Sequence, residues 1–331
     1  MDAWTAQLRK WPMLSVLVFG QISNTLSVLV LTRPKLRKNT CSLYLIGASI
    51  SNTICSFVSI FYSVLSSGFG YSLVSQYRVL CKFLPYMYYS TLFLGSWFIL
   101  LACIDRYCST HARATIRQFS HIKTARWLLI FIPLLCFITH IHILIYIDWI
   151  QINRCSFITF DFLLFFYIYY VVIYAFMIPI LYMIFAVLTI YNVRKTKKSV
   201  SLVMKRVGTM IQPQKRQQML NAQLLRMLLV QVISFVILTM PLAAWNVYAG
   251  ITAYVPKSVE RRSIERLISV DFQLLTYINI GSTCVIYTIT ARLFREELQA
   301  LFRCQWFKNA VRRQQQPSYL FSITRRIAPV Q

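Results

Sequence analysis

Seven long stretches of this sequence contain almost no charged side chains. Six of them have no Asp, Glu, Lys or Arg over at least 19 residues, and the seventh carries only Asp271. A helix needs about 20 largely apolar residues to cross a bilayer. The stretches are 13–31, 39–77, 83–104, 127–147, 162–193, 227–256 and 267–291. They are too long and too uniformly apolar for barrel strands, so the sequence predicts an all-α membrane protein with seven transmembrane helices.

The overall composition agrees with this prediction. Hydrophobic residues make up 57% of the 331 residues and charged residues only 13%. Soluble domains average about 45–50% apolar and about 25% charged residues. The composition therefore excludes a disordered, collagenous or coiled-coil chain, and it argues against a soluble enzyme. The residues also show no nucleophile–base set, phosphate loop or metal cluster, so we expect neither an enzyme nor a bound cofactor or metal.

The basic residues are distributed unequally between the two sides of the membrane. Of the 35 Lys and Arg residues, 26 follow the first, third, fifth and seventh stretches. Because cytoplasmic loops carry an excess of Lys and Arg, the N-terminus is expected outside and the C-terminus in the cytosol. The net charge of +26 thus predicts a cytosolic surface that attracts anionic membrane lipids, and a further reading adds an acidic protein partner. The positions of the charges do not indicate binding to nucleic acid.

Two of the nine cysteines have a distinct position in this topology. Only Cys81 and Cys155 fall on or next to the outer side, which is oxidising. We therefore expect a disulfide between the top of the third helix and the second outer loop. The alternative is two unrelated thiols.

The third helix also carries a charged motif at its other end. Asp105-Arg106-Tyr107 begins 24 residues after Cys81, a separation of about 36 Å along a helix. One helix therefore carries a disulfide on the outer side and the motif on the inner side. Arg106 would act as a latch that is paired in the inactive state, or it would extend to lipid headgroups.

With these features the chain resembles the rhodopsin-like (class A) G protein-coupled receptors over roughly residues 12–304. Residues 33–40 are also similar to invertebrate receptors grouped with the FMRFamide-type neuropeptide receptors. The resemblance implies a plasma-membrane receptor with a short cytosolic amphipathic eighth helix, an extracellular ligand of the neuropeptide class and a heterotrimeric G protein as partner. The residues that carry it are Asn24, Asp105, Arg106, Tyr107, Trp127, Pro179, Phe235, Pro241, Tyr287, Phe294 and Arg295.

Several switch positions depart from the family pattern. Asn52 stands where the family usually has Asp, which puts a sodium site in doubt, and Thr239 replaces the Trp two residues before Pro241. Residues 283–287 read Thr-Cys-Val-Ile-Tyr instead of Asn-Pro-x-x-Tyr. Asn221 lies near the position of a common acidic partner for the arginine. Normal coupling to a G protein therefore does not follow from the resemblance alone.

Candidate ligand-binding residues lie in the outer halves of the helices. Tyr88, Trp245 and Tyr277 are aromatic, which suits a peptide or another aromatic ligand. Tyr88 also occupies the place where amine receptors carry an Asp, which disfavours a monoamine. Asp271 is an acid within a span and would receive a ligand cation, or it would pair with Lys257, Arg262 or Arg266.

The predicted organisation has three parts. Residues 1–10 form an extracellular N-terminus, 11–304 the seven-helix receptor domain with the eighth helix, and 305–331 a basic cytoplasmic tail. Cys304 follows the amphipathic stretch and is a candidate for palmitoylation, or a reduced thiol. The alternatives for function are a seven-helix transporter or channel, which the absence of an internal repeat disfavours, and a chemosensory or constitutively active orphan receptor.

Overall fold

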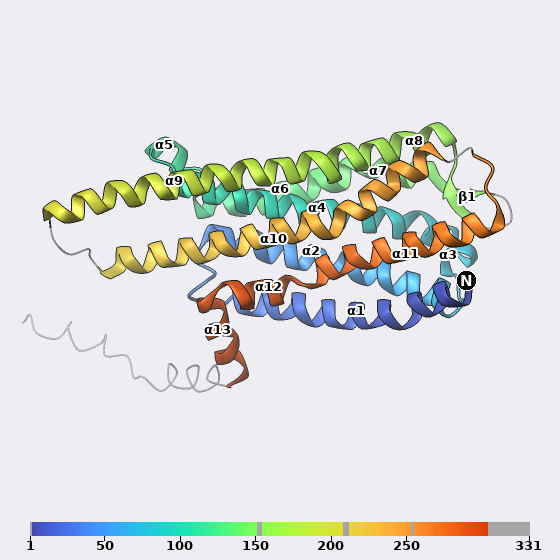
Figure 1. The fold of residues 1–331 in the computed structure, drawn as a ribbon, viewed down its shortest axis with the longest axis horizontal. Coiled ribbons are helices and arrows are strands. Elements are labelled where there is room, and N and C mark those ends of the chain that lie inside the picture. The colour runs from blue at the N-terminus through green and yellow to red at the C-terminus, as the bar shows by residue number, and fades with distance from the viewer. Residues whose placement is uncertain (1, 151–153, 208–211, 253–254, 304–331) are drawn as a thin grey trace, which may run out of the picture.

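The computed structural model of the chain describes residues 2–150, 154–207, 212–252 and 255–303. Within these ranges six helices are long and apolar enough to cross a membrane, and a bent pair of helices provides the seventh span. The spans run side by side along the long axis of the molecule (Figure 1). The prediction of a seven-helix bundle is therefore confirmed.

The spans differ in how many helical segments they contain. The first, third and sixth are each a single α-helix, the second continues from α2 into the π-helix that follows it, and the fourth, fifth and seventh are composite. In order they are α1 (Asp2–Leu31), α2 (Thr40–Ser63), α4 (Arg78–Thr110), α6 (Ile122–Thr139) with α7 (Ile141–Tyr146), α8 (Phe160–Tyr169) with the π-helix η2 (Tyr170–Met177) and α9 (Ile178–Val207), α10 (Gln212–Ile251), and α11 (Val259–Gly281) with α12 (Thr283–Thr290).

Short elements connect the spans. The π-helix η1 (Val64–Gly68) and α3 (Leu73–Gln76) follow α2, and α5 (Ala114–Arg117) follows α4. An antiparallel pair of strands, β1 (Ile147–Ile150) and β2 (Arg154–Phe157), precedes α8, with Trp149 opposite Cys155. The amphipathic helix α13 (Arg292–Phe302) follows α12.

α4 defines two ends of the bundle. Cys81 lies in its first turn and Arg106 in its last turns. We call these the disulfide end and the Arg106 end. In Figure 1 the strand β1 and the N-terminus lie at the disulfide end, and α5 and α13 lie toward the Arg106 end.

The first helix is longer than the charge-free stretch that predicts it. It begins at Asp2, so residues 2–10, which we expected to form a tail, continue α1. This segment contains Ala, Gln, Leu, Arg and Lys, all of which have high helix propensity, which explains the extension.

The seventh span is broken at Ser282, and α11 and α12 meet there at 51°. Two polar residues of α1 bind the backbone groups near the break. The amide nitrogen of Asn24 donates to the carbonyl of Ile280 at 3.2 Å, and the hydroxyl of Ser23 accepts from the backbone N–H of Cys284 at 3.1 Å. Since lipid offers backbone groups no hydrogen-bonding partner, these contacts make the break tolerable inside a membrane.

The same region shows a close approach between two glycines. A Cβ atom added to Gly281 would lie 3.1 Å from the Cα of Gly20, closer than an ordinary van der Waals contact. Glycine on both helices therefore lets α1 lie near enough to α11 for Asn24 to reach the carbonyl of Ile280.

The two family prolines lie in different surroundings. Pro241 lies inside the continuous helix α10. Pro179 is the second residue of α9 and directly follows η2, where the α-helical hydrogen-bonding pattern gives way to a π-helix. Proline has no N–H and its ring crowds the preceding turn, so a local adjustment of this kind before Pro179 is expected.

Candidate functional site

The disulfide end of the bundle is held by a covalent link. Cys81 at the start of α4 and Cys155 on β2 are joined by a disulfide, with their Cα atoms 5.6 Å apart. These are the two cysteines that the topology singles out. The described cysteines at 41, 55, 103, 108, 136 and 284 are buried free thiols. The strand pair is therefore tied to the top of the third span.

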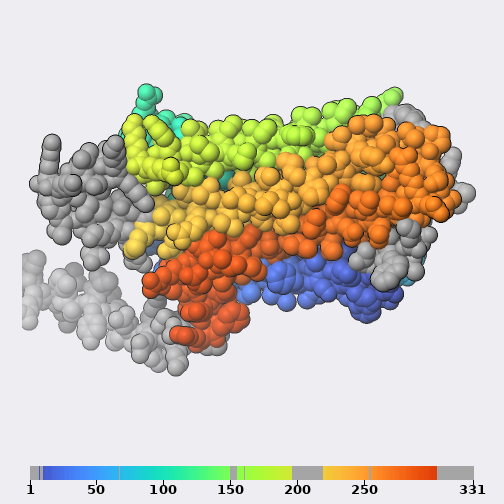
Figure 2. Space-filling view, in the orientation of Figure 1, coloured from blue at the N-terminus to red at the C-terminus, as the bar shows by residue number. Residues whose placement is uncertain are grey.

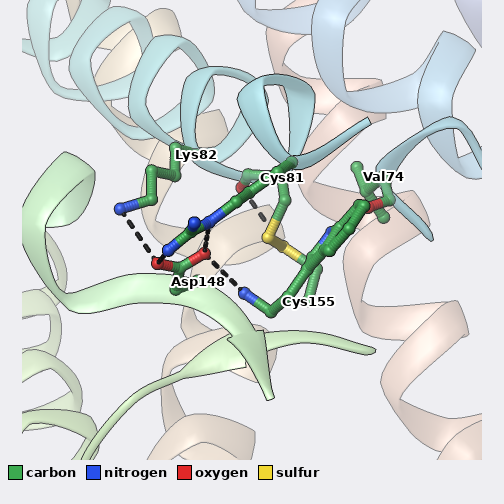
Figure 3. The surroundings of a disulfide bond; sticks show 7 residues. Val74, Cys81, Lys82, Asp148 and Cys155 are labelled. Carbon is green, nitrogen blue, oxygen red and sulfur yellow. Dashed lines mark hydrogen bonds and ion pairs between the residues drawn. A yellow bond between two sulfur atoms is a disulfide. The ribbon is translucent and has the colours of Figure 1, made fainter. Parts of the chain in front are cut away.

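Ionic contacts surround this disulfide (Figure 3). Asp148 on β1 accepts from Nε of Arg78 at 2.7 Å and lies 3.2 Å from Nζ of Lys82. The backbone N–H of Trp149 also donates to Asp148, at 2.8 Å. The hydrogen bond from Arg78 is the main reason that the pKa of Asp148 is lowered from its ordinary value. These contacts attach the strand pair to α4 a second time.

At the opposite end, the Arg106 side chain is buried within the bundle. Its ion pair with Asp105 involves two side chains that are each 3% exposed. Asp105 in turn accepts a hydrogen bond from Ser120 at 2.7 Å. A buried charge is costly unless it is paired and hydrogen-bonded. Burial therefore argues against an Arg106 that extends to lipid headgroups.

Two neutral side chains from other elements complete the contacts of Arg106. Nη1 donates to the amide oxygen of Asn221 on α10 at 2.9 Å, and Nη2 donates to that of Asn39 at 2.8 Å. Asn39 is also the N-cap of α2, where its oxygen accepts from the backbone N–H of Cys41 at 3.0 Å. Arg106 thus links α4 to α2 and α10. We call this group of Asn39, Asp105, Arg106 and Asn221 the arginine cluster.

The other expected switch residues pack between the spans. The ring of Phe235 lies 5.4 Å from that of Tyr174 and 5.5 Å from that of Tyr182. Tyr287 is fully buried, and its ring contacts Phe294 at the start of α13. Tyr107 packs against Phe185 of α9 at 5.7 Å. These rings connect α4, α9, α10, α12 and α13.

A hollow of about 410 Å³ lies between α10 and α11 at the disulfide end. Figure 2 shows these two helices side by side on one face of the molecule. Among the expected ligand residues, Trp245 belongs to its lining. The lining comprises Trp245, Tyr248, Ser258, Glu260, Arg261, Ile264, Glu265 and Ile268.

Glu265 is the most connected charged residue of this hollow. It accepts from the hydroxyl of Tyr248 at 2.7 Å, from Nζ of Lys257 at 2.7 Å and from Nε of Arg261 at 3.0 Å. Glu265 is not among the ligand-binding residues expected from the sequence. The spacing of Arg261 and Glu265 on a helix is a usable signal for the ion pair, but the contact with Tyr248 depends on the packing of α10 against α11.

Asp271 lies one turn deeper on the same side of α11. It follows Ile264 by seven residues and Ile268 by three, and both of these line the hollow. Its neighbour Phe272 contacts Trp245, with ring centroids 6.3 Å apart. Asp271 is exposed, and no ion pair joins it to another described residue. Lys257, one of its expected partners, instead binds Glu265.

The remaining expected ligand residues lie inside the bundle. Tyr277 is buried, and its hydroxyl hydrogen-bonds to Ser59 of α2. Tyr88 is partly buried on α4, and its ring contacts that of Tyr89 at 4.7 Å. Cys304, the candidate for lipidation, and the expected tail at 305–331 lie outside the described residues.

Comparison with known proteins gives a family match over most of the chain. Residues 23–287 match the model of the 7 transmembrane receptor (rhodopsin family). The chain belongs to this family. The prediction of a rhodopsin-like receptor is therefore confirmed, and the assignment excludes an enzyme as well as a seven-helix transporter or channel.

Shorter similarities connect this rhodopsin-family chain to human chemokine receptors. It is 35% identical over 106 residues to C-C chemokine receptor type 1 and 32% identical over 106 residues to C-C chemokine receptor type 4, both from Homo sapiens. Each match covers 31% of this chain and 28% of the relative. Because the chain covers little more than a quarter of either relative, these matches do not transfer a ligand.

Proposed function

We propose that this rhodopsin-family receptor lies in the plasma membrane, binds an extracellular peptide and activates a heterotrimeric G protein. The observation that carries the proposal is the arginine cluster. It holds a buried cation between three spans at the end of the bundle where most basic residues lie. A movement of α10 would separate Asn221 from Arg106 and open that end to a partner.

The proposed orientation places the disulfide end outside the cell. The segments after the first, third, fifth and seventh spans carry 26 of the 35 basic residues, which supports a cytosolic Arg106 end. A disulfide at the other end supports exposure to an oxidising compartment. The hollow between α10 and α11 then faces outward, and the basic loops face anionic lipid and the G protein.

The hollow is the proposed entrance of the ligand site. Trp245 and Tyr248 provide aromatic surface, and Tyr88 and Tyr277 extend this surface inside the bundle. Glu265 already has three donors, whereas Asp271 has none among the described residues. We therefore assign the recognition of a ligand cation, such as an N-terminal amine or an arginine, to Asp271. A charge in an apolar span is costly unless a partner compensates it.

Two ligand classes are candidates. The resemblance of residues 33–40 favours a neuropeptide. The similarity to C-C chemokine receptors favours a chemokine-class ligand as the second candidate. A screen of both classes against cells that express the receptor, with a second-messenger readout, separates them.

Replacement of Asp271 tests the ligand site once an agonist is found. Asp271→Asn keeps the shape of the side chain but removes its charge. We expect agonist potency to fall by about 30-fold or more, since truncating one member of a desolvated charged pair costs about 2–5 kcal/mol. Asp161→Asn is the matched control, because Asp161 is another exposed acid at the disulfide end, in the first turn of α8.

Surface expression should be the same in the two variants. If both retain full potency, Asp271 does not contact the ligand. If Asp271→Asn lowers the melting temperature without changing potency, the residue is structural.

A further inference from the structure

A second amide side chain of α10, besides that of Asn221, joins the Arg106 end of this helix to another element. The side-chain oxygen of Gln223 accepts from the backbone N–H of Leu293 at 2.9 Å. Leu293 is the second residue of α13, and the first four N–H groups of a helix have no partner within that helix. Ala291, which precedes α13, provides no side-chain acceptor. Gln223 therefore supplies the partner of this N–H from 70 residues away in the sequence.

The first turn of α13 is itself held in place. The ring of Phe294 is 1% exposed and lies 5.6 Å from that of Tyr287. Nη1 of Arg295 donates to the backbone carbonyls of Thr288 and Ile289 at 2.9 and 3.0 Å. These contacts fix the start of α13 against the end of α12. Because one side of the hydrogen bond between α13 and α10 is thus fixed, the bond restrains the other side, α10.

The Arg106 end of α10 is held from two directions. Asn221 and Gln223 are two residues apart, which turns their side chains by about 200° around the helix axis. Asn221 accepts from Arg106 of α4 at 2.9 Å, whereas Gln223 binds α13. A displacement of this end of α10 away from the rest of the bundle breaks both hydrogen bonds. The contact with α13 therefore opposes the same movement as the contact with Arg106.

The surroundings of Gln223 are positively charged. Gln223 lines a hollow of about 260 Å³ between α10, α12 and α13, together with Arg226, Arg292 and Arg295. Among the described residues, no Asp or Glu belongs to this lining. The N-terminus of a helix also carries a partial positive charge. A carboxylate at position 223 would therefore be a stronger acceptor for the Leu293 N–H than the amide is.

We propose that Gln223 is a positioning residue for activation: its hydrogen bond to α13 holds α10 in the resting position and breaks when α10 moves. The proposal rests on the proposed function, in which a movement of α10 opens the Arg106 end to a G protein. It gives α13 a role of its own, as the fixed point against which the resting position of α10 is set. The ligand-independent activity of the receptor then depends on the acceptor at position 223.

Two substitutions of Gln223 should change this activity in opposite directions. Gln223→Met keeps the length of the side chain but removes its oxygen. Ligand-independent nucleotide exchange on a purified heterotrimeric G protein should rise about two- to tenfold, the equivalent of one ordinary hydrogen bond. Gln223→Glu supplies a charged acceptor, so the same exchange should fall at least about threefold. A side chain that only stabilises the fold would not give opposite effects.

Hydrogen exchange at the backbone amide of Leu293 measures the contact without a G protein. In the full-length receptor in nanodiscs, this amide should exchange faster in Gln223→Met than in the wild type, and more slowly in Gln223→Glu. Gln299→Met and Gln299→Glu are the matched controls, because Gln299 is an exposed glutamine toward the other end of α13. Both controls should match the wild type in the exchange of Leu293 and in ligand-independent activity.

Unchanged hydrogen exchange of Leu293 in Gln223→Met overturns the proposal, because the contact would then not protect this amide. Faster exchange with unchanged ligand-independent activity, at equal surface expression, also overturns it, since the contact would form without restraining α10. If Leu293 responds as expected but neither the wild type nor any variant activates a G protein, the contact is supported and the proposed function is contradicted. If Gln223→Met fails to fold, the direction of both measurements in Gln223→Glu decides.

Discussion

At the residue scale, Arg106 combines complete burial with partners that are mostly uncharged. Asp105 compensates its charge from the same helix, while the contacts to α2 and α10 are made by the amides of Asn39 and Asn221. A hydrogen bond between a cation and a carboxylate is stronger than one between a cation and an amide. Asn221 therefore holds α10 less tightly than an acid would, which favours activity without a ligand.

Asn39 offers a direct test of the arginine cluster. Asn39→Ser should keep the cap of α2, since serine is also a good N-cap, but its shorter hydroxyl should not reach Arg106. Losing this hydrogen bond from a charged group costs about 1.5–3 kcal/mol, so we expect ligand-independent nucleotide exchange to rise by about tenfold or more. The exchange rate is measured in membranes at matched receptor density.

Asn39→Ala is the comparison variant. It loses both the cap and the contact with Arg106, so it should also be less stable, by about 0.5–2 kcal/mol. Unchanged basal exchange in Asn39→Ser, at normal expression, would show that this contact does not restrain the receptor.

Residues fixed by spacing along one helix are the ones that the sequence predicts well. Cys81 and Arg106 belong to one helix at a separation that spans the membrane, and no tertiary information is needed to place them. Asn39 and Glu265 could not be found in this way. Their roles depend on which side chains of other helices lie nearby, and a single sequence does not contain those contacts.

At the element scale, α13 is attached to the loop after α1 by a buried acid. Glu297 is 4% exposed and accepts from Nε of Arg33 at 2.8 Å, and it lies 2.7 Å from Nζ of Lys35. Burial acts to raise the pKa of Glu297, but the hydrogen bonds from Lys35 and Arg33 outweigh it, and the pKa is lowered. The carboxylate therefore stays charged and holds the amphipathic helix against the bundle.

Glu297→Gln should loosen α13. The amide cannot form the ion pairs, and losing hydrogen bonds between charged groups costs about 1.5–3 kcal/mol. Hydrogen exchange of residues 292–302 measures the effect. Glu296→Gln is the matched control, because its neighbouring carboxylate forms an exposed pair with Arg292 and should contribute little.

The effect of pH on α13 has the same origin. The pKa of Glu297 is lower in the folded state than in the unfolded state. The ion pairs of Glu297 therefore stabilise the folded state fully above the ordinary glutamate pKa, and this stabilisation is lost as the pH falls through the pKa of the folded state. Acidification of the wild type should thus approach the behaviour of Glu297→Gln. Equal protection of α13 in both glutamine variants would contradict this account.

The irregular elements were not predictable from the pattern of apolar residues. Pro179 indicates a disturbance in the fifth span, but not that it takes the form of a π-helix before the proline. The seventh span lacks the family proline, and the break at Ser282 still forms, with Ser23 and Asn24 bound to the backbone around it. Both features depend on how neighbouring helices pack.

At the scale of the whole molecule, the fold and the family followed from charge-free stretches and a few spaced motifs. The seven spans, the amphipathic helix and the membership of the rhodopsin family were all predicted. The ligand class was not determined, because aromatic residues serve both the membrane interface and ligand pockets, and the sequence does not separate the two uses.

In the proposed mechanism, the Arg106 end activates a G protein when a ligand binds at the disulfide end. The most direct test is agonist-evoked guanine-nucleotide exchange on purified heterotrimeric G proteins, comparing wild type with Arg106→Ala in nanodiscs. We predict exchange in the wild type and at least about a tenfold loss in Arg106→Ala, equivalent to 1.4 kcal/mol, with agonist binding retained. Undiminished exchange in Arg106→Ala, or a wild-type receptor that binds its agonist without evoking exchange on any G protein, would contradict the account.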